Sequence, residues 1–360
     1  MADYYLGIMT GTSLDGIDVA LICHEDAQDF RYLTHYEHPM PEAVRAQLYA
    51  LYQRGENELQ RAAQSAWQLS QACAQAVHIL LQRCQKTAAE IRAIGSHGQT
   101  LRHCPNAQPP YTIQIQNPAL LAELTGIDVI ADFRSRDLAC DGQGAPLAPL
   151  FHRALCATRP INIVNIGGIA NLSVITAEQC FGFDTGTGNA LMDAWIQRHQ
   201  HKNYDRGAAW AKSGQLHHEL LRHFLRDPFF SAPPPKSSGR DYFDLAWLDR
   251  HLAAFPSLTA EDVQHTLCAL TATTIAQAVY QYGQGKKILL VGGGARNPLL
   301  VTLLRQALPE FEFQKSSIPP QALEASGFAW LAAQFCQRRP LDLNTITGGQ
   351  CRILGALYPH

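Results

Sequence analysis

The sequence lacks an excess of charge of either sign. Its 360 residues include 29 Lys and Arg against 31 Asp and Glu, which gives a formal net charge of -2. Non-specific nucleic-acid binding relies on a strong positive field, so this balance argues against a nucleic-acid partner. Because 46% of the residues are hydrophobic and only 17% are charged, a disordered chain is excluded as well. We expect a compact protein whose length favours two domains around a cleft.

Long hydrophobic runs are also missing. Thr, Gln, Gly or a charged residue interrupts every apolar stretch before it reaches the roughly 18 to 20 residues of a membrane span. The N-terminal sequence MADYYLGIMTGTSLDG has no basic segment ahead of an apolar one and no small-residue cleavage site. We therefore expect a cytoplasmic protein without a membrane partner.

Paired cysteine and histidine motifs are absent too. The ten cysteines are scattered and never form CxxC, so we interpret them as reduced, mostly buried thiols. The fifteen histidines include no HExxH motif and no spacing typical of a structural zinc site. No metal site made by the protein alone is expected.

The sequence does contain a repeated pattern, because the order of predicted strands and turns at its start recurs in its second half. Apolar runs at 4–9, 17–23 and 30–36 predict three antiparallel strands, and helical spacing follows from Pro41 to about Lys86. From Pro160 the order of strand, glycine turn, strand and strand recurs in INIVNI, GG, ANLSVI and CFGFDTG.

The second half continues with further helices and a strand. Helices are predicted at 189–199 and 260–282, a buried strand at 287–291, and a last helix from Glu324 to about Arg338. The pattern predicts an α/β protein with domains at 1–158 and 159–360, the last helix and tail being able to pack back on the first domain.

Three glycine-rich loops follow or join predicted strands, at 11–18, 165–172 and 292–294. The first, GTSLDGID, has no Walker A lysine, and neither a Walker A loop nor a dinucleotide fingerprint fits between two strands. Its small residues would let backbone N–H groups and hydroxyls approach a polyphosphate, with Asp15 or Asp18 holding Mg²⁺ through water. An ordinary hairpin turn is the alternative for this loop alone, whereas three such loops favour a ligand crevice.

Seven motifs, in order between Leu6 and Leu357, resemble those of the anhydro-N-acetylmuramic acid kinases of the actin, hexokinase and sugar-kinase ATPase superfamily. Two positions depart from that family's pattern, because Thr187 stands where Pro is expected and Asp141 where a small residue is expected. Neither change removes a group with obvious chemistry. The motifs are GTSLDGID (11–18), SHGQT (96–100), DFRSRDLACDGQGAPLAP (132–149), NIGGIANL (165–172), FDTGTGN (183–189), PPKSSGRDYF (234–243) and VGGGARN (291–297).

The resemblance implies two duplicated actin/hexokinase-like domains of the ribonuclease H type, flanking a cleft for ATP and substrate. It implies ATP-dependent phosphorylation of 1,6-anhydro-N-acetylmuramic acid with hydrolytic opening of its anhydro ring. The products would be N-acetylmuramic acid 6-phosphate and ADP, in peptidoglycan recycling. Mg²⁺ is expected to arrive with ATP. The resemblance also implies a homodimer.

The predicted catalytic residues are Asp184 and Glu324. Opening an acetal normally requires two carboxyl groups. If the leaving O6 attacks the γ-phosphate as the C1–O6 bond breaks, one strong base suffices, and Asp184 matches the family's catalytic Asp. An Asx turn or a helix N-cap is the structural alternative. Glu324 would orient water or a Mg²⁺-bound water, or would only complement a helix dipole.

The sugar-binding candidates lie mostly in predicted polar loops. The anionic lactyl group calls for a bidentate cation, and Arg134, Arg136 and Arg240 are available, of which we favour Arg134 and Arg240. Loop capping is the alternative for the polar residues at 97–100. The positions expected to bind the sugar are His97, Gln99, Thr100, Arg134, Asp137, Lys236 and Arg240.

ATP is expected to contact the glycine loops, because glycine admits close approach of the phosphates, base and ribose. The expected positions are Gly11, Thr12, Ser13, Leu14, Asp15, Gly16, Ile17, Asp18, Gly167, Gly168, Gly292, Gly293, Gly294 and Asn297.

Two other functions remain open at this point. One is a kinase of another sugar without ring opening, since the ATP loops would look similar whatever fills the cleft. The other is a non-enzymatic ATP-binding sensor or a chaperone-like ATPase, which would hydrolyse ATP independently of any sugar.

Overall fold

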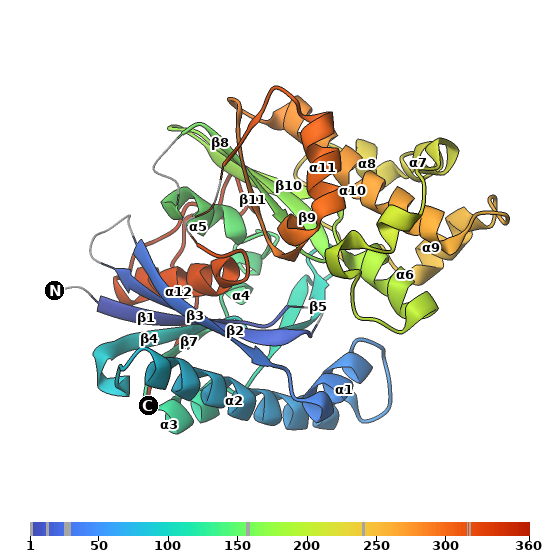
Figure 1. Cartoon of the computed structure of the whole chain (residues 1–360). Helices are drawn as coiled ribbons and strands as arrows, with labels where there is room; N and C mark the ends of the chain where they lie inside the picture. Colours follow the sequence, from blue (N-terminus) through green and yellow to red (C-terminus); the bar gives the residue numbers. More distant parts are fainter. Residues whose placement is uncertain are drawn as a thin grey trace. The chain divides into compact units, whose positions relative to one another are not determined.

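The structure is a computed structural model of the chain, and it divides into two compact units (Figure 1). The first consists of Met1–Leu155 and Gln321–His360, and the second of Cys156–Pro320. The described residues are 3–11, 14–24, 30–155, 159–239, 242–314, 316 and 318–360.

The first unit is built on a six-stranded mixed sheet. Its strands are β1 (Asp3–Met9), β2 (Gly16–His24), β3 (Phe30–Pro39), β4 (Ile91–Ser96), β7 (Val129–Ala131) and β13 (Ala356–Tyr358). They lie in the order β13-β7-β4-β1-β2-β3. β1, β2 and β3 form the antiparallel meander that the sequence predicts, whereas β4 and β7 continue the sheet in parallel to β1.

The second unit has a five-stranded sheet with the same topology. Its strands are β8 (Ile161–Ile166), β9 (Ile169–Ile175), β10 (Cys180–Thr187), β11 (Lys287–Val291) and β12 (Glu312–Gln314), in the order β10-β9-β8-β11-β12. β8, β9 and β10 are antiparallel neighbours, and β11 and β12 run parallel to β8. This order and these directions repeat β3-β2-β1-β4-β7, so the predicted duplication of a ribonuclease H-like α/β fold is confirmed.

Helices cover both faces of the first sheet. Leu6 and Ile8 of β1 belong to a core that also contains Leu69 and Val77 of α2, whereas Gly7 faces α12. This alternation follows from the two-residue period of a strand. The helices of this unit are α1 (Glu42–Leu51), α2 (Glu58–Arg83), α3 (Pro118–Thr125), α4 (Ser135–Leu138), α5 (Ala148–Leu155) and α12 (Ala322–Cys336).

Two glycines bring α12 close to the first sheet. Gly7 of β1 and Gly95 of β4 are neighbours in the strand register. A Cβ atom at Gly7 would overlap the carbonyl oxygen of Ala325, and one at Gly95 would overlap that of Phe328. The helix backbone therefore lies directly against the two strands.

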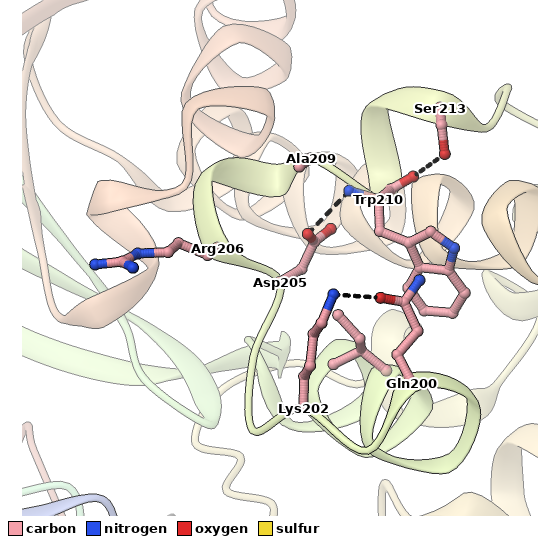
Figure 2. A pocket seen from close by; sticks show the side chains of 8 residues that line it. Gln200, Lys202, Asp205, Arg206, Ala209, Trp210 and Ser213 are labelled. Atoms are coloured by element: carbon pink, nitrogen blue, oxygen red, sulfur yellow. Dashed lines mark hydrogen bonds between the residues drawn. The ribbon is translucent and has the colours of Figure 1, made fainter.

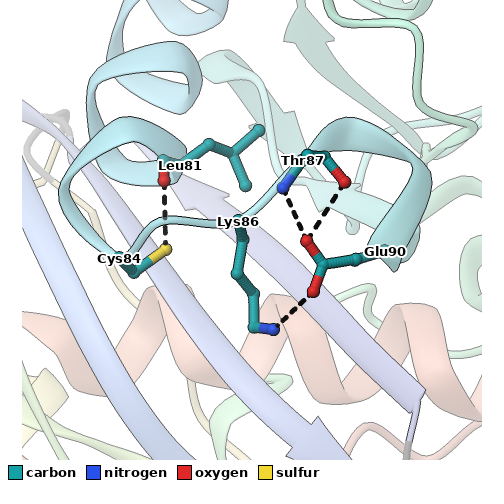
Figure 3. A network of polar contacts seen from close by, with 5 residues as sticks. All are labelled: Leu81, Cys84, Lys86, Thr87 and Glu90. Carbon is teal, nitrogen blue, oxygen red and sulfur yellow. Dashed lines mark hydrogen bonds and ion pairs between the residues drawn. The ribbon is translucent and has the colours of Figure 1, made fainter.

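A polar network joins the end of α2 to β4 (Figure 3). Glu90 Oε2 accepts hydrogen bonds from the backbone N–H of Thr87 at 2.8 Å and from its hydroxyl at 3.1 Å. Lys86 Nζ lies 2.9 Å from Oε1 of the same carboxylate. Pairing with Lys86 and the bonds from Thr87 lower the pKa of Glu90 to about 2. The network holds the short helical turn η1 (Ala88–Glu90) that leads into the strand.

A separate hairpin formed by β5 (Gln99–Cys104) and β6 (Tyr111–Ile115) completes the first unit. The apolar pattern of the sequence does not indicate β5, because four of its six side chains (Gln, Thr, Arg and His) are polar and interrupt the two-residue period of a strand. Residues 99 and 100 therefore lie in a strand rather than in a polar loop, and the loop-capping interpretation is wrong for them.

In the second unit the long helix α10 packs against β9 and β10. Its core includes Leu172, Phe183, Leu270 and Ile275. The predicted helices at 189–199 and 260–282 are confirmed. The helices of this unit are α6 (Ala190–Gln200), α7 (His218–Phe224), α8 (Pro228–Ser231), α9 (Leu245–Leu252), α10 (Ala260–Tyr282) and α11 (Pro298–Ala307), with short 3-10 turns η2 (Arg206–Ala208), η3 (Ala211–Ser213) and η4 (Gly293–Arg296).

Among the described residues, no helix is both long enough and apolar enough to span a membrane. The nine cysteines in this part of the chain are free thiols, and only Cys351 is exposed.

Replacing Gly95 by alanine should weaken the packing of α12 on the first unit. The added methyl group would overlap the Phe328 carbonyl, so the helix has to shift. Overpacking of this kind costs about 1–3 kcal/mol, which urea unfolding would measure. Gly55→Ala is the matched control, because its Cβ would meet only the flexible Arg61 side chain. Equal free energies of unfolding for the two variants would contradict the prediction.

Candidate active site

The first glycine loop connects β1 to β2 and is anchored by one apolar side chain. Leu14 is fully buried and adopts a left-handed backbone conformation with φ 58°, and its N–H donates to the carbonyl of Gly11 at 3.1 Å. Asp15 is exposed on this turn, whereas Ile17 is buried in the strand that follows. Thr12 and Ser13 lie outside the described residues.

Arg134 is held by two acceptors within the first unit. His97 Nε2 accepts from Arg134 Nε at 3.0 Å and from Nη2 at 2.9 Å, and the Gly144 carbonyl accepts from Nη1 at 2.7 Å. A guanidinium has five N–H groups, so two of them have no hydrogen-bond partner among the described residues. Burial lowers the pKa of Arg134 to about 10, and the charges of Glu324 and Asp137 oppose this shift. The arginine therefore remains a cation at neutral pH.

His97 is neutral in this arrangement. Its Nε2 can accept from the guanidinium only when it carries no proton. Burial, and then the charge of Arg134, hold the pKa of His97 well below its usual value. His97 therefore orients Arg134. Its Nε2 is already occupied by the hydrogen bonds from the arginine.

Asp137 is fully buried, and both of its oxygens have partners. Oδ2 accepts from the N–H of Gly144 at 2.6 Å, and Oδ1 accepts from the Thr347 hydroxyl at 2.9 Å. The carboxylate thus ties the loop that supports Arg134 to the C-terminal tail. Asp141, in the same loop, has φ 64°, a left-handed conformation that Asp tolerates better than most residues. The backbone conformation at this position is therefore compatible with Asp, where the sequence comparison with the family leads us to expect a small residue.

Two further sugar-binding candidates of the first unit lie on β5, and the catalytic candidate Glu324 lies on α12. Gln99 Nε2 donates to the Tyr52 hydroxyl at 2.9 Å, and its buried Oε1 has no partner among the described residues. Thr100 Oγ1 accepts from Gln114 at 3.2 Å. Glu324 lies in the first turn of α12 and interacts electrostatically with Arg134.

Asp184 lies near the end of β10 and is only 9% exposed. Its Oδ2 accepts from the backbone N–H of Ser238 at 2.8 Å, and its own N–H donates to the carbonyl of Lys236 at 3.1 Å. Burial raises the pKa of Asp184 to about 7, although the Ser238 N–H and the charge of Lys236 oppose the shift. An N-cap role is excluded, because α6 begins only at Ala190.

Lys236 anchors the segment at 236–238, whose backbone contacts Asp184. Its Nζ donates to the carbonyls of Phe229 at 2.9 Å and Phe230 at 3.3 Å. Burial lowers the pKa of Lys236, and the charge of Asp184 opposes this. Arg240 lies outside the described residues. Ser238 was not predicted from the sequence, because its backbone N–H rather than its side chain makes the contact.

The glycine turn after β8 rests on the beginning of α6. The carbonyl of Gly168 accepts from the N–H groups of Gly188 at 2.9 Å and Ala190 at 3.0 Å, and that of Gly167 accepts from Asn189 at 2.8 Å. These bonds join the fourth and fifth motifs of the sequence, NIGGIANL and FDTGTGN, within one unit, although about twenty residues separate the bonded groups.

The third glycine loop lies against the same strand end. Gly292 has φ 81°, and a Cβ there would overlap Asn165, while one at Gly294 would overlap Ile166. Because β8 and β11 are parallel neighbours, both glycine loops lie beyond the same edge of the sheet. Asn297 caps α11, since its Oδ1 accepts from the two N–H groups of the first turn at 3.1 and 3.0 Å. Its contact with ATP stays a prediction.

A hollow of about 540 Å³ lies beside the end of α6 (Figure 2). Asp205 accepts from the N–H of Trp210 at 3.0 Å, and Lys202 donates to Gln200 at 2.9 Å, so its polar groups contact one another. The sequence motifs do not indicate this hollow, because none of its lining residues belongs to a glycine-rich loop. The lining residues are Ile196, Gln200, Lys202, Asp205, Arg206, Ala209, Trp210 and Ser213.

Two solved structures resemble the chain at low sequence identity. The activator of the 2-hydroxyisocaproyl-CoA dehydratase from Clostridium difficile with bound ADPNP is 13% identical, with a TM-score of 0.46 over 93% of this chain and 97% of its own. A ROK family glucokinase from Streptomyces griseus in complex with glucose and AMPPNP is 12% identical, with a TM-score of 0.41 over 92% of this chain and 99% of its own.

Sequence relatives are much closer. The anhydro-N-acetylmuramic acid kinase of Pseudomonas syringae pv. tomato is 47% identical over 99% of both chains, and that of Variovorax paradoxus is 46% identical over 99% of both. The model of the anhydro-N-acetylmuramic acid kinase family matches residues 3–360. The match confirms the resemblance carried by the seven motifs, and the chain belongs to the anhydro-N-acetylmuramic acid kinase family of phosphotransferases.

Proposed function

We propose that this kinase converts 1,6-anhydro-N-acetylmuramic acid, ATP and water to N-acetylmuramic acid 6-phosphate and ADP. Ring opening and phosphorylation of O6 are coupled in one reaction. Family membership supports the substrate. The observation that supports the hydrolytic step is Asp184, a buried carboxylate whose pKa of about 7 suits a general base at neutral pH.

In this reaction Asp184 takes a proton from water as the water oxygen attacks C1. The electron pair of the C1–O6 bond passes to O6, and O6 attacks the γ-phosphorus of ATP, from which ADP leaves. The phosphoryl group captures the developing alkoxide, so no second carboxylic acid is needed to protonate the leaving oxygen. Ser238 holds one carboxylate oxygen of Asp184 and so directs the other.

Arg134 is the proposed partner of the lactyl carboxylate. Two of its N–H groups remain for an anion, and neutral His97 and Gly144 fix the plane of the guanidinium. Planar, bidentate pairing of this kind gives both affinity and orientation. Arg240, Lys236, Gln99 and Thr100 complete the proposed sugar site, with Glu324 orienting water. We propose that Asp137 supports the loop that positions Arg134, in addition to making the predicted sugar contact.

The glycine loops at 11–18, 167–168 and 292–294, with Asn297, are proposed to bind ATP. Among the described residues, no group of three His, Cys, Asp or Glu side chains could hold a metal ion. Mg²⁺ keeps several waters and binds through phosphates and one or two carboxylates, so the exposed Asp15 fits it. The ion would neutralise charge on the phosphates.

We also propose that the enzyme acts in peptidoglycan recycling and amino-sugar catabolism in the cytoplasm. Its support is the substrate, because muramic acid is a sugar of the cell wall. The homodimer implied by the family stays a proposal as well.

Incubation with Mg·ATP and 1,6-anhydro-N-acetylmuramic acid in ¹⁸O-labelled water tests the function. Mass spectrometry should find a phosphorylated sugar carrying one ¹⁸O at C1. Because an anomeric hydroxyl exchanges slowly through the open-chain form, early time points are compared with unlabelled product kept in the same water. Phosphorylation without ¹⁸O would support a kinase without hydrolysis, and sugar-independent ATP hydrolysis would support the sensor or chaperone-like alternative.

Asp184→Asn should abolish turnover and retain nucleotide binding. The amide keeps the shape of the carboxylate but cannot accept the proton, and loss of a general base costs about 10²- to 10⁴-fold in kcat. ADP release would measure kcat, and calorimetry would measure ADP binding. Asp249→Asn, at an exposed carboxylate paired with Arg198, should retain normal rates. Near-normal activity of Asp184→Asn would remove this residue from the mechanism.

Asp184 should couple activity and stability to pH in opposite directions. The base must be ionised, so kcat/KM should rise with pH through about 7. Folding raises the pKa from 3.8 to about 7, so this group leaves stability unaffected below about pH 4, lowers it progressively between about pH 4 and 7, and reaches its full cost above 7. The full cost is on the order of 4 kcal/mol. Asp184→Asn should therefore unfold at a higher urea concentration than wild type at pH 8, and parallel pH profiles for the two proteins would contradict this.

A further inference from the structure

Asn171 on β9 lies directly opposite Asp184 on β10. The register pairs Phe183 with Leu172 and Asp184 with Asn171, and a bulge follows only after Asp184. Directly opposite residues of antiparallel strands point to the same face, with Cβ atoms about 4.5–5.5 Å apart. Leu172 and Phe183 belong to the core that contains α10, so Asp184 and Asn171 lie together on the other face of the sheet.

The side chain of Asn171 has an unsatisfied acceptor. Its Oδ1 is buried and has no hydrogen-bond partner among the described residues. A buried acceptor without a donor is costly, and such groups in native proteins are rare outside binding sites. Asp184 cannot satisfy it in the ionised form, because a carboxylate is an acceptor only. Two acceptors that face each other across neighbouring strands call for a donor with two hydrogens.

We propose that Asn171 Oδ1 accepts one hydrogen of the water that attacks the anomeric carbon, while Asp184 accepts the other. This assignment rests on the proposed function. Two acceptors at fixed positions set the orientation of the water, so its lone pair is directed toward C1. Asn171 is thus a positioning residue for the hydrolytic step.

In the proposed step each hydrogen of the water has a defined destination. The hydrogen facing Asp184 passes to the carboxylate, and the water oxygen forms the new bond to C1. The C1–O6 electron pair passes to O6, which takes the phosphoryl group from ATP. The hydrogen facing Asn171 stays on the oxygen and becomes that of the anomeric hydroxyl of the product.

Asn171→Ala should lower kcat about 10- to 100-fold, the range expected when a reacting group loses its alignment. The KM values for sugar and ATP should stay within about twofold, and the acid limb of the pH profile should not move. Gln179→Ala removes an exposed amide from the turn that joins the same two strands and should behave as wild type. A kcat within about twofold of wild type, or a loss confined to KM, would overturn the proposal.

A shift of the acid limb to lower pH in Asn171→Ala would also overturn it. That result would mean that Asn171 accepts a hydrogen bond from protonated Asp184 and so favours its neutral form. Asn171→Asp keeps an acceptor and adds a negative charge beside Asp184. It should therefore move the acid limb of the pH–rate profile to higher pH and recover most of the rate at pH values above that limb. An unmoved acid limb in Asn171→Asp counts against the assignment even if Asn171→Ala does not fold.

Methanol provides a readout that a merely structural role would not change. Methanol has a single O–H, which it can donate to Asp184 but not to Asn171 as well. In water–methanol mixtures, Asn171→Ala should therefore raise the ratio of methyl glycoside phosphate to hydrolysed product, and an unchanged ratio contradicts the proposal. The labelled-water experiment on wild type separates the two claims. Unlabelled product refutes the proposed hydrolysis itself, whereas labelled product with a fully active Asn171→Ala refutes only the role of Asn171.

Discussion

The proposed chemistry depends on the burial of one carboxyl group, that of Asp184, away from water. Asp184 would have a pKa near 3.8 in solvent and would be a weak base. Its burial at the end of β10 raises that pKa to about 7, whereas the Ser238 N–H keeps the ionised form accessible. The two effects oppose each other, and their balance leaves the group close to the pH at which it has to work. The cost is a carboxyl group that opposes folding increasingly as the pH rises from about 4 to 7.

The first unit shows the complementary solution for a cation. Arg134 loses solvent, but it stays charged because the intrinsic pKa of a guanidinium is so high. Its positioning requires an imidazole that never becomes protonated, and the arginine charge together with burial keeps His97 neutral. Asp137 and Thr347 hold the loop from which Gly144 completes this arrangement. Asp137, which is expected to contact the sugar, therefore also has a structural role, because its carboxylate holds this loop in place.

The duplication explains why the glycine loops recur. A strand-turn-strand unit followed by parallel strands places a turn at the same edge of each sheet, and only small residues allow neighbouring backbones to approach there. Gly292 and Gly294 fit against Asn165 and Ile166 for this reason. In the first unit the same principle acts in a different place, where Gly7 and Gly95 admit the backbone of α12.

The amino-acid sequence by itself determined the family, the repeated strand order and the positions of Asp184 and Arg134, because these depend on local periodicity and on contiguous motifs. It could not reveal β5, whose polar residues hide the strand period. It also could not reveal the bonds of His97, the ties of Asp137 to Thr347, or the facing of Asn171 and Asp184. Those contacts join residues separated by up to 210 positions, and only strand register and packing bring them together. The pKa of Asp184 belongs with them, because it depends on how much water the folded chain excludes.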